Sequence, residues 1–205
     1  PMKIAIVGAS GAVGQEFMRV LAERDFPLDE LVLFGSARSA GNIYSFRGKD
    51  LEVKLLQHND DFKGVDIAFV SAGAGTSKEY EQTITRHGAV MIDNSSAFRM
   101  DADVPLVVPE VNARVLSQHK GIIANPNCST IQMLVALKPI YDAVGIRRIV
   151  VSTYQAVSGT GQKAIEELAE QTRQIFNCQD ILKEVYPHRI AFNCLPQIDV
   201  FMEND

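Results

Sequence analysis

The chain has 205 residues, of which 46% are hydrophobic and 22% charged, so it carries enough apolar side chain for a packed core and is not an intrinsically disordered chain. Its 20 lysines and arginines against 25 acidic residues give a net charge of −5, which argues against a nucleic-acid-binding protein. No apolar run approaches the roughly 18 residues of a membrane span, and the apolar run at the start of the chain is too short for a signal peptide. Only three cysteines occur, without metal-ligand spacing, so we expect a cytoplasmic protein with neither a disulfide framework nor a metal site.

Short β-branched runs alternate with longer amphipathic segments in the first part of the chain, which predicts βαβ units on a parallel sheet. Helices are expected at 13–23 and near 78–86. Strands are expected at 3–7, 30–34, 65–71, 89–92 and 121–124, with a further strand at 52–56 on the flank of the sheet.

The later part of the chain predicts a helix at 129–144, which Pro139 should kink or divide. A strand at 149–155 and an amphipathic helix at 163–176 should follow. We place a domain boundary just before Cys128. Residues 1–127 are then a Rossmann-like, doubly wound α/β cofactor domain, and residues 128–205 form a second unit.

A glycine-rich loop joins the first expected strand to the first helix, with glycines at positions 8, 11 and 14. In this setting small residues let the backbone approach a pyrophosphate, whose charge the helix N-terminus stabilises. The loop therefore predicts dinucleotide binding, and the alternative is a tight turn without a ligand. The candidate cofactor contacts are Gly8, Ser10, Gly11, Ala12 and Val13.

The loop after the second expected strand contains Ser36, Arg38 and Ser39 but no acidic residue. An NAD site usually places an acid here, hydrogen-bonded to the ribose 2′-hydroxyl, whereas a guanidinium with hydroxyl groups suits the 2′-phosphate of NADP. We therefore expect NADP as the cofactor. A solvated surface arginine is the alternative explanation of Arg38.

Two further loops of small residues are candidates for the cofactor site. Ser71, Ala72 and Gly73 follow the most apolar strand and would let a flat ring or a ribose lie close to the backbone, although an ordinary glycine turn explains them equally well. Ser158 and Gly159 follow the strand expected at 149–155 and could meet the nicotinamide end of the cofactor.

Cys128 stands at the expected start of a helix, where the dipole and the free backbone N–H groups favour a thiolate. Such a cysteine is a nucleophile for an acyl carbon, and the neighbouring amides could form an oxyanion hole. The alternative is a small buried apolar residue, which is the better interpretation of Cys178 and Cys194.

Two polar segments also end expected strands. The run from Asp93 to Arg99 combines hydroxyl groups, an amide and a guanidinium, which together suit a phosphate or a carboxylate. Gln155 can donate and accept hydrogen bonds toward a substrate, but a satisfied polar side chain at a strand end explains it as well.

Taken together, these motifs resemble the aspartate-β-semialdehyde dehydrogenases. The resemblance rests on GASGAVG at 8–14, SARSAG at 36–41, NPNCSTIQM at 125–133 and STYQAVSG at 152–159, and the segments 104–112 and 192–201 also fit. The related N-acetyl-γ-glutamyl-phosphate reductases place glycine and tyrosine around their cysteine. Asn127 before Cys128 and Ser129 after it favour the aspartyl enzyme.

This resemblance implies NADPH-dependent reductive dephosphorylation of L-4-aspartyl phosphate to aspartate semialdehyde, a step toward lysine and diaminopimelate, threonine and methionine. It assigns the acyl-thioester to Cys128, substrate orientation to Gln155 and phosphate binding to Arg99, and Asn127 joins the expected substrate contacts. It also implies cofactor contacts at Ser10–Val13, Arg38, Ser39, Ser158 and Gly159.

Members of this family are longer than 205 residues and are usually homodimers or homotetramers through their second domain, so the resemblance implies that residues 128–205 are part of an α+β catalytic and dimerisation domain. We therefore expect a full-length form that continues past Asp205 and supplies a histidine acid/base, an arginine for the substrate carboxylate and a lysine near the phosphate. Without the acid/base, the chain alone should be slower by on the order of 10²–10⁴. The alternatives are a non-catalytic NADP-binding module and an enzyme like the N-acetyl-γ-glutamyl-phosphate reductases.

Overall fold

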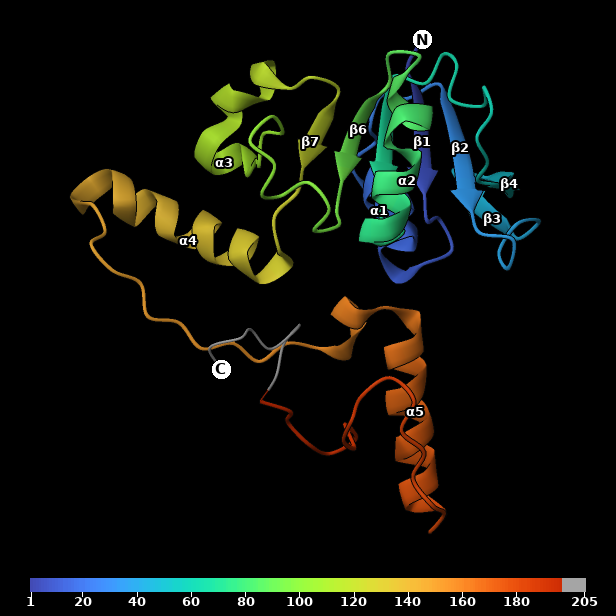
Figure 1. Cartoon of the computed structure of the whole chain (residues 1–205), viewed down its shortest axis with the longest axis vertical. Coiled ribbons are helices and arrows are strands. Elements are labelled where there is room, and N and C mark those ends of the chain that lie inside the picture. Colours follow the sequence, from blue (N-terminus) through green and yellow to red (C-terminus); the bar gives the residue numbers. More distant parts are fainter. Residues whose placement is uncertain (197–205) are drawn as a thin grey trace. The chain divides into compact units, whose positions relative to one another are not determined.

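The structure is a computed structural model, and it describes residues 1–196. The chain divides into two compact units, Pro1–Thr153 and Tyr154–Asp205 (Figure 1). Part of the 192–201 segment that supports the resemblance lies outside the described residues. The domain boundary expected before Cys128 stays a prediction.

The first unit is built on a seven-stranded sheet with the order β3-β4-β2-β1-β5-β6-β7. Its neighbouring strands are parallel, except that β3 runs antiparallel to β4. The strands are β1 Lys3–Val7, β2 Glu30–Gly35, β3 Ile43–Phe46, β4 Lys49–Leu55, β5 Ile67–Val70, β6 Val90–Asp93 and β7 Ile122–Ala124.

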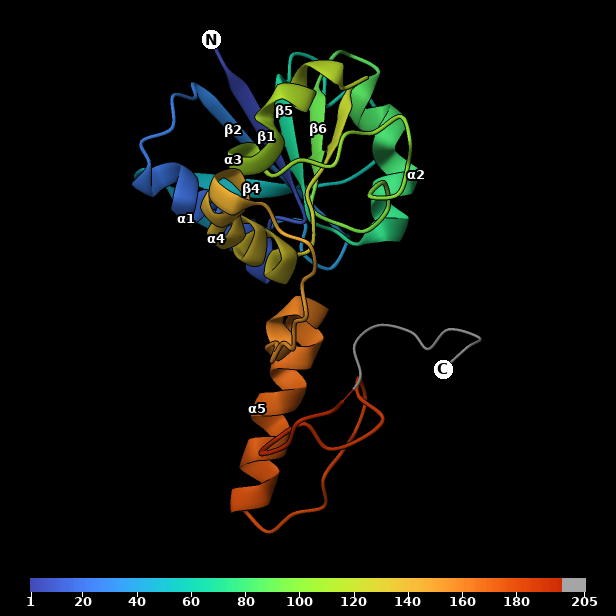
Figure 2. The ribbon, with the colours of Figure 1, turned by 90° about the vertical axis from the view of Figure 1, so that its left-hand side faces the viewer.

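Helices cover both faces of this sheet, which confirms the doubly wound α/β prediction. Helix α1 (Ala12–Glu23) packs Met18 and Leu21 onto one face, against Ile4, Ile6 and Leu33. Helix α2 (Ala74–Thr85) packs Ile84 onto the other face, in a core cluster with Val7, Phe34, Val70 and Met91. Figure 2 shows the sheet between the two helices. The almost unbroken apolar run of the β5 region follows from this, since its side chains alternate between two apolar layers.

Two parts of the first unit have no counterpart in the sequence-based prediction. Strand β3 lies at the edge of the sheet, and Arg47 and Gly48 connect it to β4 with φ values of 49° and 76°. These two positive φ values are typical of a two-residue hairpin turn, but Arg-Gly is not among its strongest sequence signals. Helix α3 (Pro109–Asn112) and the following 3₁₀ helix η1 (Ala113–Gln118) are too short for a periodic apolar pattern.

Helix α4 (Cys128–Val144) follows β7 and continues through Pro139, so this proline does not divide it. None of its residues is buried, and together with α3 it borders a groove of about 850 Å³. Apolar side chains line much of this groove, among them Val111, Leu134, Leu137 and Tyr141.

The strand expected at 149–155 is wrong: this segment has no regular secondary structure. Its residues have a high β propensity, but a strand also needs a neighbour to accept and donate its backbone hydrogen bonds. No described strand pairs with it, and Val150 remains 82% exposed.

The second unit is organised around α5 (Gln162–Phe176), which follows the short 3₁₀ helix η2 (Val157–Thr160). The helix was expected, but its buried face is partly polar. Glu167, Gln171 and Gln174 are all buried and hold the segment that follows the helix by side chain–backbone hydrogen bonds. Gln171, for example, donates to Leu182 O at 2.9 Å and accepts from the amides of Ile190 and Ala191.

Candidate active site at the sheet edge

The carboxyl ends of five parallel strands bring most of the expected site segments to one edge of the sheet. Across the sheet, the order is the 36–41 loop after β2, the glycine loop after β1, residues 71–73 after β5, residues 94–99 after β6 and residues 125–128 after β7. In Figure 1 these strand ends point the same way, and α4 begins beyond β7. Open α/β sheets bind their ligands at this edge.

The three glycines of the first loop have different structural roles. A Cβ on Gly8, whose φ is 87°, would lie 2.2 Å from the carbonyl oxygen of Ser71, and one on Gly14 would lie 2.2 Å from the carbonyl oxygen of Gly8. These two glycines are therefore required for close backbone packing. A Cβ on Gly11 would meet only the Gly8 carbonyl oxygen, at 3.4 Å, so the backbone at the start of α1 is open to a ligand.

Ser10 lies in the same loop, and its hydroxyl is buried without a hydrogen-bond partner among residues 1–196. A buried hydroxyl without a partner costs about 1–3 kcal/mol. Such a group in a loop at a helix N-terminus is suited to a ligand oxygen.

The loop after β2 presents Arg38 to solvent. Arg38 is exposed and has no ion pair or hydrogen bond within the described part of the chain. Ser39 turns inward: its Oγ lies 3.2 Å from the carbonyl oxygen of Ser36, to which it donates, and it packs against Gly35, where a Cβ would approach it to 2.3 Å. Ser36 itself is exposed beside Arg38, so the loop offers a guanidinium and a hydroxyl at the same turn.

The loop after β5 leads directly into α2. Gly73 is the N-cap of this helix with φ 87°, and a Cβ at this position would meet nothing within 4 Å. Ser71 and Ala72 are half-buried between the glycine loop and the loop after β6. This backbone is open enough for a ring or a sugar to lie against it.

The loop after β6 is joined to its neighbours on both sides by side-chain hydrogen bonds. Asn125 donates from Nδ2 to Asn94 Oδ1 at 2.7 Å. Arg99 donates from Nε to the carbonyl oxygen of Asn125 at 3.0 Å and from Nη2 to that of Asn94 at 3.1 Å. The guanidinium therefore bridges the ends of β6 and β7, next to the segment that carries Cys128.

Cys128 is the first residue of α4 and is exposed. Asn127 caps the helix: its side-chain oxygen accepts from the amides of Ser129 and Thr130, at 3.0 and 3.3 Å. The asparagine before the cysteine thus orients the first turn, and the Cys128 thiol stands at the positive end of the helix dipole.

Gln155, Ser158 and Gly159 belong to the second unit and are exposed there. Ser158 and Gly159 form part of η2, and Gln155 precedes it. Their roles toward substrate and cofactor stay predictions.

The sequence analysis placed Asp93 at the start of a candidate anion-binding run, but it gave no role to its carboxylate. It accepts from Ser77 Oγ and from Ser95 Oγ, both at 2.6 Å, and it is fully buried at the end of β6. An acidic residue that ends an apolar strand was the one available signal, because burial is not visible in the sequence. Among residues 1–196, no group of three or more His, Cys, Asp or Glu side chains could hold a metal ion.

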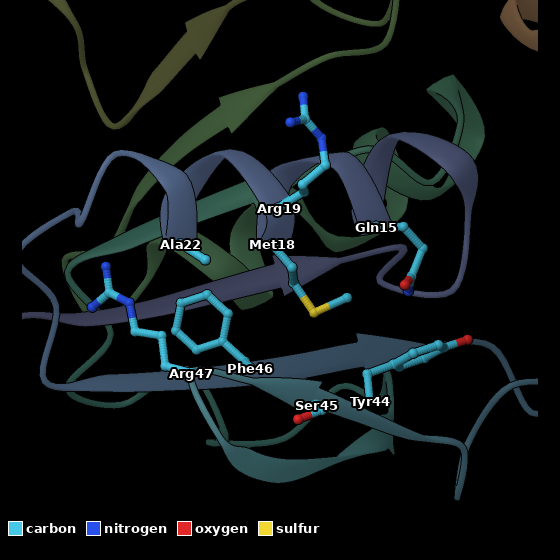
Figure 3. A pocket seen from close by; sticks show the side chains of 8 residues that line it. All are labelled: Gln15, Met18, Arg19, Ala22, Tyr44, Ser45, Phe46 and Arg47. Carbon is cyan, nitrogen blue, oxygen red and sulfur yellow. The ribbon is translucent and has the colours of Figure 1, made fainter.

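A separate pocket of about 280 Å³ lies between α1 and β3 (Figure 3). Its two arginines are already engaged: Arg19 pairs with Glu16 and Glu23, and Arg47 donates to the carbonyl oxygens of Leu21 and Phe26. Because its cations are paired within the chain, this pocket offers no free charge to a phosphate, and we do not include it in the site.

Residues 3–119 match the NAD-binding domain of the semialdehyde dehydrogenases, and residues 137–205 match their dimerisation domain. The chain belongs to the semialdehyde dehydrogenase family. It is 59% identical to the aspartate-semialdehyde dehydrogenase of Aquifex aeolicus and 49% identical to that of Bacillus subtilis, over 98% and 99% of this chain. It spans 60% of the length of each of these relatives.

Solved structures of this family are also similar to this chain in sequence and in fold. Aspartate semialdehyde dehydrogenase II from Vibrio cholerae, complexed with ASA, is 52% identical and superposes with a TM-score of 0.95 over 99% of this chain and 61% of its own. An aspartate semialdehyde dehydrogenase from Candida albicans with NADP is 28% identical, with a TM-score of 0.59 over 71% of this chain and 48% of its own.

Membership of the semialdehyde dehydrogenase family fits the sheet edge described above. Its NAD-binding domain includes the glycine loop, the loop after β2 and the loop after β6. No described helix is both long enough and apolar enough to cross a membrane.

Proposed function

We propose that the full-length protein carrying this chain reduces L-4-aspartyl phosphate to aspartate 4-semialdehyde with NADPH, through an acyl-thioester on Cys128. The order of loops along the sheet edge supports this proposal most strongly. The loops suited to a dinucleotide lie at β2, β1 and β5, the anion-binding arginine lies at β6, and the thiol lies at β7. The names of the relatives favour this substrate over an N-acetylglutamyl phosphate.

The residues at the strand ends fit a bound dinucleotide. The unpartnered hydroxyl of Ser10 and the open backbone at Gly11 lie where a pyrophosphate would approach α1. Ala12 and Val13, the first residues of α1, are exposed and would lie beside it. When bound, the reduced cofactor supplies a hydride, and the backbone at Ser71–Gly73 leaves room for its ring.

We assign NADP rather than NAD as the cofactor because of the residues in the loop after β2. Arg38 is exposed and has no partner among residues 1–196, Ser36 lies beside it, and residues 35–41 contain no acid that would favour a ribose hydroxyl. The NADP-bound Candida albicans structure supports the same choice at family level.

The chain's own residues account for the acyl transfer. The Cys128 thiolate attacks the acyl carbon, so that the C–S bond forms while the carbon–oxygen bond to phosphate breaks. Arg99 has three N–H bonds without a described acceptor, and these can take the charge of the departing phosphate. Backbone amides at the start of α4 can stabilise the oxyanion, and Asn127 holds that turn in place. Hydride addition to the thioester carbon then gives a hemithioacetal oxyanion on Cys128. Its collapse breaks the C–S bond, releases the aldehyde and restores the thiolate.

The reverse reaction of the full-length protein tests this function. Aspartate semialdehyde, inorganic phosphate and NADP⁺ should produce NADPH, followed by its absorbance, and N-acetylglutamate semialdehyde should be a poor substitute. Continued NADPH formation beyond one equivalent per Cys128 in the absence of phosphate, or a preference for the acetylated substrate, would contradict the proposal. Saturable NADP binding without any turnover would instead favour the non-catalytic binding module.

A further inference from the structure

We propose that the buried carboxylate of Asp93, together with Ser77 and Ser95, positions Arg99 for binding of the phosphate group. This inference rests on the proposed function, because it concerns the same anion site. Asp93 ends β6 at the edge of the sheet where the ligand would lie, but it is 0% exposed and so has no surface to offer a ligand. Its effect on the anion must therefore pass through the loop that it holds.

The carboxylate joins three elements. Oδ1 accepts from Ser77 Oγ, in the first turn of α2, and Oδ2 accepts from Ser95 Oγ, in the loop after β6, both at 2.6 Å. Asp93 is itself the last residue of β6 and pairs with Val70 of β5 and Ala124 of β7. A buried carboxylate is tolerated when such short bonds replace its hydration, so this cluster is a rigid point at the edge of the sheet.

The path from this cluster to Arg99 is short and continuous. Ser95 Oγ, which donates to Asp93, also accepts from the amide of Ala97 at 3.1 Å and so sets the turn of the loop. Phe98 follows, 4% exposed within the core, and fixes the chain on the other side of the turn. Arg99 is the next residue, and its two hydrogen bonds return to Asn94 and Asn125.

The direction in which phosphate affinity changes when Asp93 is replaced separates this positioning role from a purely electrostatic one. A buried negative charge near an anion site repels phosphate, so removal of that charge alone would tighten phosphate binding. If Asp93 instead positions Arg99, its removal releases the loop and weakens phosphate binding. Asp93→Asn has nearly the same shape and removes the charge, so the direction of the change decides between the two roles.

The test measures how much inorganic phosphate protects Cys128 from iodoacetamide in the full-length protein, with the modified cysteine located by mass spectrometry. We expect the half-protecting phosphate concentration to rise at least ~10-fold in Asp93→Asn and in Arg99→Gln, since each weakens a charge-assisted contact. The double variant should be no worse than Arg99→Gln, because Asp93 acts through Arg99. NADP binding should be unchanged, and so should phosphate protection in Asp103→Asn, which removes an exposed acid paired with Lys120.

Ser77→Ala keeps the buried carboxylate and removes one of its two hydroxyl partners, so it serves if Asp93→Asn does not fold. We expect it to weaken phosphate protection about threefold to tenfold, on the scale of one such hydrogen bond. If a folded Asp93→Asn or Ser77→Ala variant bound phosphate as well as or more tightly than the wild type, while Arg99→Gln was still impaired, the positioning role of Asp93 would be overturned. The anion site of the proposed function would not be affected by that result. If phosphate gave no protection in the wild-type protein, the anion site of the proposed function would be wrong, and this inference would fall with it.

Discussion

Gly8 and Gly11 occupy the same loop, yet substitution should lower stability at Gly8 and NADP affinity at Gly11. Gly8→Ala places a Cβ 2.2 Å from a carbonyl oxygen at a φ of 87° and should lower the free energy of unfolding by at least about 2 kcal/mol. Gly11→Ala adds a methyl group to open backbone, so stability should change by less than ~0.5 kcal/mol while NADP affinity falls. Urea unfolding and NADP titration of both variants measure these effects. Equal stability losses would contradict the assignment.

Arg38 is the residue on which the choice of NADP depends. Arg38→Ala should weaken NADP binding about tenfold or more, because a charge-assisted hydrogen bond is worth roughly 1.5–3 kcal/mol, and NAD binding should hardly change. Arg24→Ala, an exposed substitution at the C-cap of α1, is the matched control. Calorimetric titration with both nucleotides measures how much each variant changes the affinity for NADP relative to that for NAD. An equal loss for NADP and NAD would remove the argument for 2′-phosphate recognition.

At the level of single residues, the sequence suggests which residue types suit the proposed chemistry, and the roles of these residues stay predictions. Gly8, Arg38 and Cys128 could be singled out because a tight turn, a guanidinium and a thiol at these positions suit a dinucleotide and an acyl carbon. The capping role of Asn127 and the burial of Asp93 could not be foreseen, because they depend on where backbone amides and hydroxyl groups from distant segments come to lie.

The start of α4 depends on its cap, which places the thiol. Asn127→Ala removes the oxygen that accepts from the amides of Ser129 and Thr130, and it should cost about 1 kcal/mol of stability. Asn127→Asp keeps a capping oxygen and should retain most of that stability. Denaturant unfolding measures the stability of both variants. Equal destabilisation by both variants would show that the cap is not the source of the effect.

In the second unit, α5 holds the segment that follows it by polar side chains. Gln171→Leu keeps the size of the side chain but leaves Leu182 O and the amides of Ile190 and Ala191 without partners, which should cost at least about 2 kcal/mol locally. Hydrogen–deuterium exchange should then speed up at 182–191 and stay unchanged in the sheet. Gln162→Leu on the same helix, where the side chain bonds only the exposed Glu166, is the control. Unaltered hydrogen–deuterium exchange at 182–191 would contradict the role of Gln171 in holding this segment.

The elements that the sequence predicted best are those in which local pattern and long-range pairing agree. β1 was predicted with the bounds it has, and α1 and β2 within one residue, because apolar periodicity and neighbouring strands point the same way. Helix α5 was also predicted within one residue, although its buried face is partly polar. The segment 149–155 has the composition of a strand but belongs to none of the strands in the described sheet, so the local pattern alone was misleading. Edge strand β3 was missed for the opposite reason, since its pairing with β4 outweighs a weak local signal.

For the whole molecule, the chain contains a seven-stranded sheet within a matched NAD-binding domain and spans about 60% of its relatives' length. Cofactor binding and turnover can therefore be measured independently. The sheet of the first unit carries the loops that we propose for the cofactor, the anion and the reactive thiol, whereas turnover is proposed only for the full-length protein.

The most direct test of the account is the mass of Cys128 after the full-length protein is mixed with aspartate semialdehyde and NADP⁺ in the absence of phosphate. The thiolate should add to the aldehyde, and the resulting hemithioacetal should lose the hydride on its carbon to NADP⁺, which leaves an aspartyl thioester on Cys128 and forms one NADPH for each acylated site. Phosphate should then release the acyl group, and Cys128→Ala should form neither adduct nor NADPH, with turnover reduced by roughly 10⁶-fold, the scale seen when an enzyme nucleophile is removed. An adduct on Cys178 or Cys194, or NADPH formation by Cys128→Ala, would contradict the central claim.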